Sequence, residues 1–215
     1  MNQSDSGFLA DEVPLLTSSF VETKLFHETE KGYTRLFKAK RMGKWFVLKC
    51  LKKEYTENPT YQTLFQKEFE ISYQLSHPHI IQTIGLEEVS PFGKCIVMEY
   101  VDGVSLREYI NTNSFSRQDT IRWMDELCQA LSYIHTKQII HRDLKPENIL
   151  ITSNGRHVKL IDFGFSDTDS YAVLKEAAGT RRYAAPEQMK KGEKIDVRAD
   201  IYALGIILKK LGGED

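Results

Sequence analysis

Three short strings in the second half of the chain carry residues that could do chemistry together. They are residues 141–148 (HRDLKPEN), residues 162–164 (DFG) and residues 185–187 (APE). Between them they supply carboxylates, an amide and a lysine. Phosphoryl transfer needs such groups, because its transition state spreads negative charge over oxygens that must be held in line and neutralised. Coincidence does not explain three such strings in this order.

The strings resemble those of Hanks-type Ser/Thr protein kinases over about residues 20–212. This resemblance implies ATP and Mg²⁺ as cofactors and a protein as substrate. It also implies that Asp143 accepts the proton of the substrate hydroxyl and that Lys145 contacts the transferred phosphate. Asn148 and Asp162 are then the Mg²⁺ ligands, since both present hard oxygen donors. A lysine at position 145 favours Ser or Thr over Tyr as acceptor.

The resemblance also indicates the nucleotide site. Lys49 ends a strand-like segment and matches the family's phosphate-binding lysine, although a solvated strand-edge lysine is the alternative. The family's spacing selects Glu68 as its partner, while Glu70 lies on another helical face. Residues 97–103 resemble the hinge that binds adenine. There we expect Met98 as gatekeeper, backbone contacts from Glu99 and Val101, and apolar walls from Leu36, Val47 and Leu150, positions that ordinary core packing would also suit.

Two further features point to a protein substrate and an anchored site. Gly179-Thr180 and Tyr183 resemble the docking loop of Ser/Thr kinases, in which Thr180 contacts the catalytic aspartate. This loop disfavours a small-molecule kinase. Asp200 resembles the helix residue that holds the catalytic loop, and a carboxylate that accepts backbone N–H groups is a sound anchor.

The sequence departs from the family in the glycine-rich loop and in the helix that carries Glu68. Thr29, Lys31 and Thr34 align where glycines normally let the backbone approach the phosphates, so we expect weakened ATP binding. Ser72 replaces a commonly apolar residue, which predicts a mobile helix when no ligand is bound. These departures keep open a second hypothesis, a pseudokinase or weakly nucleotide-binding scaffold.

Regulation and assembly are predicted from the end of the chain. Only residues 188–215 follow Glu187, where the family continues with further helices. We therefore expect an incomplete C-terminal lobe and a partner or oligomer that covers the apolar residues 201–208. Arg142 precedes the catalytic aspartate, a pattern typical of kinases switched by phosphorylation of the activation loop. Thr168 and Ser170 are the candidate sites.

Periodicity predicts the elements that must position these residues. Strand-like segments cover residues 33–40, 44–51, 80–89, 94–101, 149–152 and 157–161. Helices are expected from Asn58-Pro59 to about His77-Pro78, from Ser105, across Ile121, Met124, Leu131 and Ile134, and over residues 198–210. With the resemblance, this order predicts an α+β, bilobal protein-kinase-like fold. A small antiparallel-sheet N-lobe with one main helix would precede a mostly helical C-lobe, truncated after the anchor helix.

The expected boundaries are a flexible leader over residues 1–19, the N-lobe and hinge over 20–101 and the C-lobe over 102–215. A net charge of −1 gives no general attraction to nucleic acid or to anionic lipid. The apolar run 201–208 is too short to span a bilayer. Three scattered cysteines and an N-terminus unlike a signal peptide favour a cytoplasmic protein without nucleic-acid or membrane partners.

Overall fold

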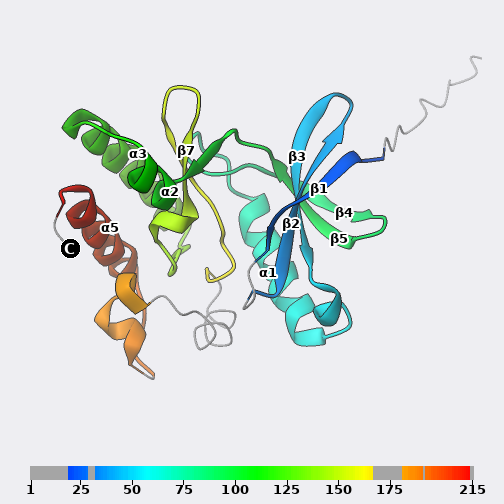
Figure 1. Cartoon of the computed structure of the whole chain (residues 1–215). Helices are drawn as coiled ribbons and strands as arrows, with labels where there is room; N and C mark the ends of the chain where they lie inside the picture. Colours follow the sequence, from blue (N-terminus) through cyan, green and yellow to red (C-terminus); the bar gives the residue numbers. More distant parts are fainter. Residues whose placement is uncertain (1–18, 29–31, 167–180, 191, 214–215) are drawn as a thin grey trace, which may run out of the picture.

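The computed structural model describes residues 19–28, 32–166, 181–190 and 192–213. A sheet-rich lobe and a helix-rich lobe lie side by side and are joined by an extended segment (Figure 1). The predicted leader falls almost entirely outside the described residues. The bilobal α+β architecture that the sequence predicts is confirmed.

The N-lobe is built on a five-stranded antiparallel sheet in the order β1-β2-β3-β5-β4. At the turn between β2 and β3, Met42 and Gly43 take positive φ angles of 49° and 78°, as a tight two-residue hairpin requires. The strands are β1 (Val21–Glu28), β2 (Thr34–Arg41), β3 (Lys44–Leu51), β4 (Thr83–Val89) and β5 (Gly93–Glu99).

Two strands differ from the prediction. Strand β1 was not expected, because all of its residues are exposed and no buried face imposes an alternating pattern. Strand β4 begins at Thr83 rather than at Ile80. The backbone of Ile80 instead forms an isolated parallel bridge with Leu160 of the other lobe, so residues 80–82 connect the lobes.

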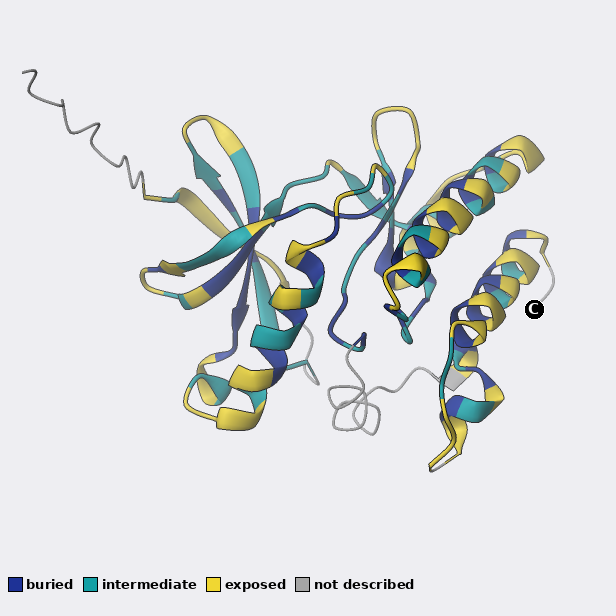
Figure 2. Cartoon of the chain, turned by 180° about the vertical axis from the view of Figure 1, so that it is seen from behind, coloured by how far each residue is buried: buried dark blue, intermediate teal, exposed yellow. Residues whose placement is uncertain are grey.

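Helix α1 (Pro59–Tyr73) lies against the sheet and begins where the sequence predicts. The Asn58 side chain accepts a hydrogen bond of 3.0 Å from the Thr60 amide, which caps the first turn. The buried face of the helix carries Leu64, Phe65, Glu68 and Ser72 (Figure 2). The short 3-10 helix η1 (Lys53–Tyr55) precedes α1. Helix α1 therefore presents the Glu68 carboxylate to the interior beside apolar residues.

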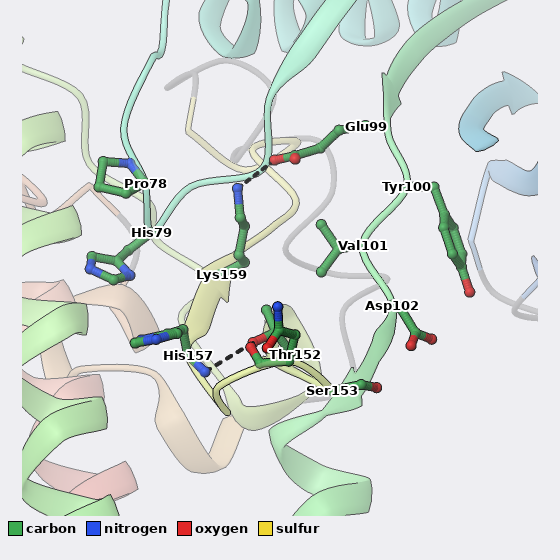
Figure 3. Close-up of a pocket in the computed structure, with 11 residues that line it drawn as sticks. Pro78, His79, Glu99, Tyr100, Val101, Asp102, Thr152, Ser153, His157 and Lys159 are labelled. Atoms are coloured by element: carbon green, nitrogen blue, oxygen red, sulfur yellow. Dashed lines mark hydrogen bonds and ion pairs between the residues drawn. The ribbon is translucent and has the colours of Figure 1, made fainter. Parts of the chain in front are cut away.

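The hinge follows β5 and continues into a small second sheet. The Glu99 carboxylate points toward Lys159, whose Nζ donates to it at 2.6 Å (Figure 3). The same carboxylate accepts from the Gln82 amide at 2.9 Å. The second sheet is antiparallel in the order β6-β7-β8, with β6 (Gly103–Ser105), β7 (Ile149–Thr152) and β8 (Val158–Leu160).

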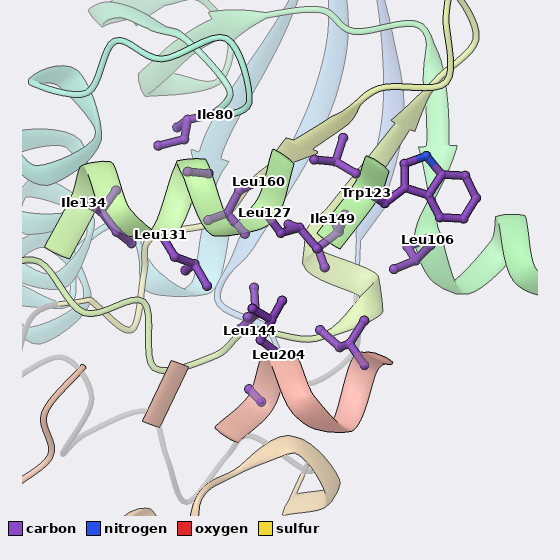
Figure 4. Packing of buried hydrophobic residues seen from close by; sticks show 14 of the residues in the cluster. Ile80, Leu106, Trp123, Leu127, Leu131, Ile134, Leu144, Ile149, Leu160 and Leu204 are labelled. Atoms are coloured by element: carbon purple, nitrogen blue, oxygen red, sulfur yellow. The ribbon is translucent and has the colours of Figure 1, made fainter. Parts of the chain in front are cut away.

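The C-lobe core packs around α3 (Arg117–Thr136), with α2 (Leu106–Thr112) and α5 (Arg198–Leu211) beside it. Leu144 of the loop before η2 (Pro146–Asn148) and Leu204 of α5 join this cluster (Figure 4). The predicted apolar face of α3 is wrong at Ile121, which is 59% exposed. The buried face is centred instead on Trp123 and Leu127, because the large indole fills the space against the second sheet and donates to the Arg156 carbonyl at 2.7 Å.

The C-terminal helix leaves apolar side chains in solvent. Ile201, Tyr202 and Leu208 of α5 are 53%, 42% and 47% exposed. The partner or oligomer expected on this face stays a prediction. Within the described residues, no helix is long and apolar enough to cross a membrane.

Candidate active site

Three charged groups from three separate elements meet at the base of the N-lobe. Nζ of Lys49 on β3 lies 2.5 Å from Oε1 of Glu68 on α1 and 3.1 Å from Oδ1 of Asp162. The Lys49 and Glu68 residues are 8% and 5% exposed. The structure thus brings Lys49 together with the partner selected from the sequence, while Glu70 bonds Gln66 on an exposed face of the helix.

A second group of side chains belongs to the catalytic loop. Lys145 Nζ lies 2.6 Å from Oδ2 of Asp143. Asn148 Nδ2 donates to the Asp143 carbonyl and to Oδ2, both at 2.9 Å. Because the amide nitrogen faces Asp143, Oδ1 of Asn148 is left as an oxygen donor for another ligand. The Ile161 amide donates to the Asn148 carbonyl at 2.9 Å, which ties this loop to the residue before Asp162.

The anchor residue Asp200 is buried under the catalytic loop. Its carboxylate accepts from the amides of His141 and Arg142, each at 2.9 Å, and lies 2.8 Å from Nε2 of His135. Arg142 has a positive φ of 63° and Asp162 one of 65°. Such left-handed backbone is uncommon for these residue types and is typical of functional sites.

Burial and neighbouring charges set the protonation of the two aspartates. Burial raises the pKa of Asp143, and the Lys145 ammonium opposes this effect. Burial would also raise the pKa of Asp162, but Lys49 outweighs it and lowers the pKa to about 2. Asp162 is therefore ionised at neutral pH. The raised pKa of Asp143 makes its carboxylate the stronger base of the two. The Asp162 charge also raises the pKa of Asp143. The hydrogen bond from the Ile161 amide to the Asn148 carbonyl holds the two segments side by side.

The expected Mg²⁺ ligands fit the ion chemically. Asp162 offers a carboxylate and Asn148 an amide oxygen, and both are hard donors suited to Mg²⁺. Among the described residues, no three His, Cys, Asp or Glu side chains gather as a metal cluster. Two protein ligands nevertheless suit Mg²⁺, which keeps several waters and binds phosphate oxygens in sites that act on nucleotides.

The residues expected around adenine come from the sheet and from β7. Val47 on β3 is a Cα partner of Met98 on β5, and Leu36 on β2 is a partner of Lys49. Leu150 on β7 pairs with Ser105 and Lys159. The Glu99 carboxylate is held by Lys159 and Gln82, and its amide donates to the Gln82 carbonyl at 3.0 Å, which leaves the Glu99 carbonyl as the group for adenine. Within the described part of the chain, no backbone hydrogen bond uses the amide or carbonyl of Val101.

A glutamine links the region after the docking loop to the catalytic loop. Gln188 donates from Nε2 to the Arg142 carbonyl and accepts from the Ala185 amide, both at 2.9 Å. This residue lies in η4 (Pro186–Met189), which follows η3 (Arg181–Tyr183). Arg198, the first residue of α5, forms an ion pair of 2.8 Å with Asp196.

Some of the expected residues fall outside the described ranges. Thr180 is one of them. The candidate phosphorylation sites Thr168 and Ser170 also lie outside, as do Thr29 and Lys31, which align with glycines of the family. The third aligned residue, Thr34, begins β2.

Comparison with known proteins identifies the arrangement. A family model described as the protein kinase domain matches residues 29–213. The chain belongs to the protein kinase family. The kinase domain is similar to the probable serine/threonine-protein kinase PknB of Lactococcus lactis, with 38% identity over 171 residues. It is also 37% identical over 181 residues to PknB of Mycolicibacterium smegmatis.

A further relative is the probable serine/threonine-protein kinase SCO3848 of Streptomyces coelicolor, with 36% identity over 183 residues. These alignments cover 77% to 80% of this chain. They cover 26% to 28% of each relative. The chain therefore spans about a quarter of the length of these relatives.

Three supporting residues of the kinase domain were not found from the sequence. His135 bonds the anchor Asp200, and Gln188 bonds the backbone of Arg142. Arg107 on α2 donates to Glu147 at 2.8 Å and to the Tyr183 hydroxyl at 3.0 Å. Each is a polar residue that a pattern alone assigns to a solvated surface, and only the folded contacts indicate its role.

Proposed function

We propose that the chain is a catalytic domain that transfers the γ-phosphate of ATP to Ser or Thr hydroxyls of protein substrates. The observation that carries this proposal is the placement of Asp143, held by Lys145 and Asn148, beside the cluster of Lys49, Glu68 and Asp162. Membership of the protein kinase family supports it. The names of the relatives, serine/threonine-protein kinases, favour the acceptor.

Each residue then has a task in the transfer. Oδ1 of Asp143 can take the hydroxyl proton of the substrate, because hydrogen bonds from Lys145 and Asn148 hold the other oxygen in place. Lys145 neutralises charge on the transferred group, and Lys49 orients the nucleotide phosphates. Bound Mg²⁺ would neutralise the charge of the phosphate oxygens, and Asp162 and Asn148 would hold it. Catalysis by positioning and charge is what phosphoryl transfer requires.

The pseudokinase alternative is disfavoured by the same contacts. A scaffold needs neither a buried lysine paired with two carboxylates nor an oriented base. The predicted weakening of ATP binding by the altered glycine-rich loop is compatible with an active enzyme. The weakened ATP binding remains within the proposal. The proposal also includes a cytoplasmic location, which the three scattered, free cysteines favour.

Incubation with magnesium and labelled ATP tests the proposal. The chain and an Asp143→Asn variant are compared for transfer to a generic basic protein, and nucleotide binding is measured for both. We expect transfer by the wild type and a loss of about 10²- to 10⁴-fold in the variant, with binding retained. Silence from both chains would favour the scaffold, and equal transfer by both would rule out Asp143 as the base.

A further inference from the structure

Gln188 joins two segments that lie far apart in the sequence. Its side-chain nitrogen Nε2 donates to the Arg142 carbonyl, and its oxygen Oε1 accepts from the Ala185 amide, both at 2.9 Å. The residue is 6% exposed. Because buried polar groups are stable only when hydrogen-bonded, this amide holds η4 and the catalytic loop together. An apolar residue of the same size would hold neither.

The Arg142 backbone is held at both of its polar groups. Its amide donates to Oδ1 of Asp200 at 2.9 Å, and its carbonyl accepts from Gln188. The φ angle of 63° at Arg142 lies in a region that a residue with a side chain adopts rarely and keeps only where its surroundings enforce it. Asp200 and Gln188 hold this conformation from outside the catalytic loop.

The Arg142 carbonyl belongs to the peptide unit that ends at Cα of Asp143. A peptide unit is planar and rigid, so a hydrogen bond to its oxygen also fixes the direction in which the chain continues. Lys145 and Asn148 hold Oδ2 of Asp143 at 2.6 and 2.9 Å. These bonds fix the carboxylate end of the side chain, whereas Gln188 fixes its backbone end. A displacement of about 1 Å at a reacting group can reduce the rate about 100-fold.

Residues 181–188, which we call the docking segment, include the end of the docking loop that the family resemblance indicates. The Tyr183 hydroxyl accepts from Arg107 at 3.0 Å, and Arg107 also donates to Glu147 at 2.8 Å. The docking segment is therefore linked to the catalytic loop on both sides of the catalytic base, at Arg142 and at Glu147. The Arg107–Glu147 pair is partly exposed, so the buried glutamine is the firmer link, since water competes less for a buried hydrogen bond.

We propose that Gln188 is a positioning residue that couples the docking segment to the catalytic base Asp143 through the Arg142 carbonyl. The inference rests on the proposed kinase function and assigns to it a residue outside the nucleotide site. The docking segment and the base then keep one relative position, which a protein substrate bound to that segment requires. Loss of the Gln188 bond lowers kcat and leaves nucleotide binding unchanged.

Steady-state phosphorylation of a generic basic protein by the full chain tests this coupling. Gln188→Met keeps the length of the side chain and removes the donor, so kcat should fall about 10- to 100-fold. The KM for ATP and the calorimetric affinity for ADP with Mg²⁺ should stay at the wild-type values. Gln129→Met makes the same change at an exposed position of α3 and should match the wild type. Unchanged kcat in Gln188→Met, or a parallel loss of nucleotide binding, would overturn the proposal.

Gln188→Glu separates positioning from the capping of η4. Its carboxyl keeps an oxygen for the Ala185 amide, but its other oxygen can donate to the Arg142 carbonyl only while it is protonated. Activity relative to the wild type at the same pH should therefore be retained at about pH 6 and fall toward about pH 9 as this buried carboxyl ionises. A ratio that stays at the wild-type level up to about pH 9 would overturn the proposal, because capping alone does not need the donor.

Hydrogen exchange measures the same link without catalysis. Amides of residues 141–148 should exchange several-fold faster, relative to those of α3, in Gln188→Met than in the wild type or in Gln129→Met. If the wild type transfers no phosphate, the kinase proposal fails, and this exchange still decides whether Gln188 holds the catalytic loop. Equal protection of the loop in all three chains would overturn the inference.

Discussion

Asp200 accepts a hydrogen bond of 2.9 Å from the backbone amide of His141, across 59 residues of sequence. Together with its bonds to Arg142 and His135, this contact makes the carboxylate the anchor of the catalytic loop. The anchor is 1% exposed. Buried amides that lose their only acceptor incur the full cost of desolvation.

The first prediction concerns the stability that this anchor provides. Asp200→Ala should lower the free energy of unfolding by about 3 kcal/mol, because it leaves two backbone amides without an acceptor. Urea denaturation monitored by circular dichroism measures the change. Asp125→Ala, at an exposed position of α3, should change stability by less than about 0.5 kcal/mol. Equal effects of both substitutions would refute the anchoring role.

The second prediction separates two glutamates of α1. Glu68→Gln removes the charge that positions Lys49, and kcat should fall about 10- to 100-fold through misplacement of the ammonium. Glu70→Gln changes the same group on the exposed face and should leave kcat unaltered. Steady-state phosphorylation of a model substrate decides between them. A larger loss in Glu70→Gln would show that the wrong glutamate was selected.

The third prediction is a pH dependence set by Asp143. Burial raises the pKa of this carboxyl above its ordinary 3.8, and only the ionised form can accept a proton. Activity should therefore fall as the pH drops through this raised pKa, at a higher pH than an exposed aspartate would give. The profile of kcat/KM reports the pKa in the free enzyme.

Lys145 provides the control for this profile. Its ammonium lowers the pKa of Asp143, so Lys145→Met should move the acidic limb to still higher pH as well as reduce the rate. An acidic limb that stays in place would show that another group is responsible.

The fourth prediction concerns the mobility of α1. Ser72 is buried, and its hydroxyl bonds the Phe69 carbonyl at 3.3 Å, so little apolar surface joins the helix to its neighbours at this point. Amides of α1 should exchange hydrogen faster than those of α3 in the absence of nucleotide. Mass spectrometry after hydrogen exchange compares the two helices. Equal protection would contradict the prediction.

Most of the site could be predicted from the sequence, because its groups lie in short strings or at regular helical spacing. Lys49, Glu68 and Asp162 meet as expected, and so do Asp143 and Asn148. Such local patterns carry their own spacing information. When the two lobes fold against each other, this spacing brings the side chains within hydrogen-bonding distance.

The remaining features depend on contacts that a single sequence does not encode locally. Strand β1 has no buried face, so its sequence lacks the alternation of apolar and polar residues that would predict a strand. The buried face of α3 differs from the predicted one because Trp123 packs into the core and Ile121 lies at the surface. Gln188 donates to the carbonyl of Arg142, far along the chain, and a glutamine does not stand out in a loop. Tertiary packing decided each of these cases.

The central claim is that Asp162 and Asn148 hold Mg²⁺ against a nucleotide bound by Lys49. Calorimetric titration with ATP, with and without Mg²⁺, tests it most directly. The wild type should bind ATP more tightly when Mg²⁺ is present. Asp162→Asn should lose this enhancement, whereas Asp196→Asn, at a carboxylate paired with Arg198, should keep it. Full enhancement by Mg²⁺ in Asp162→Asn would contradict the account.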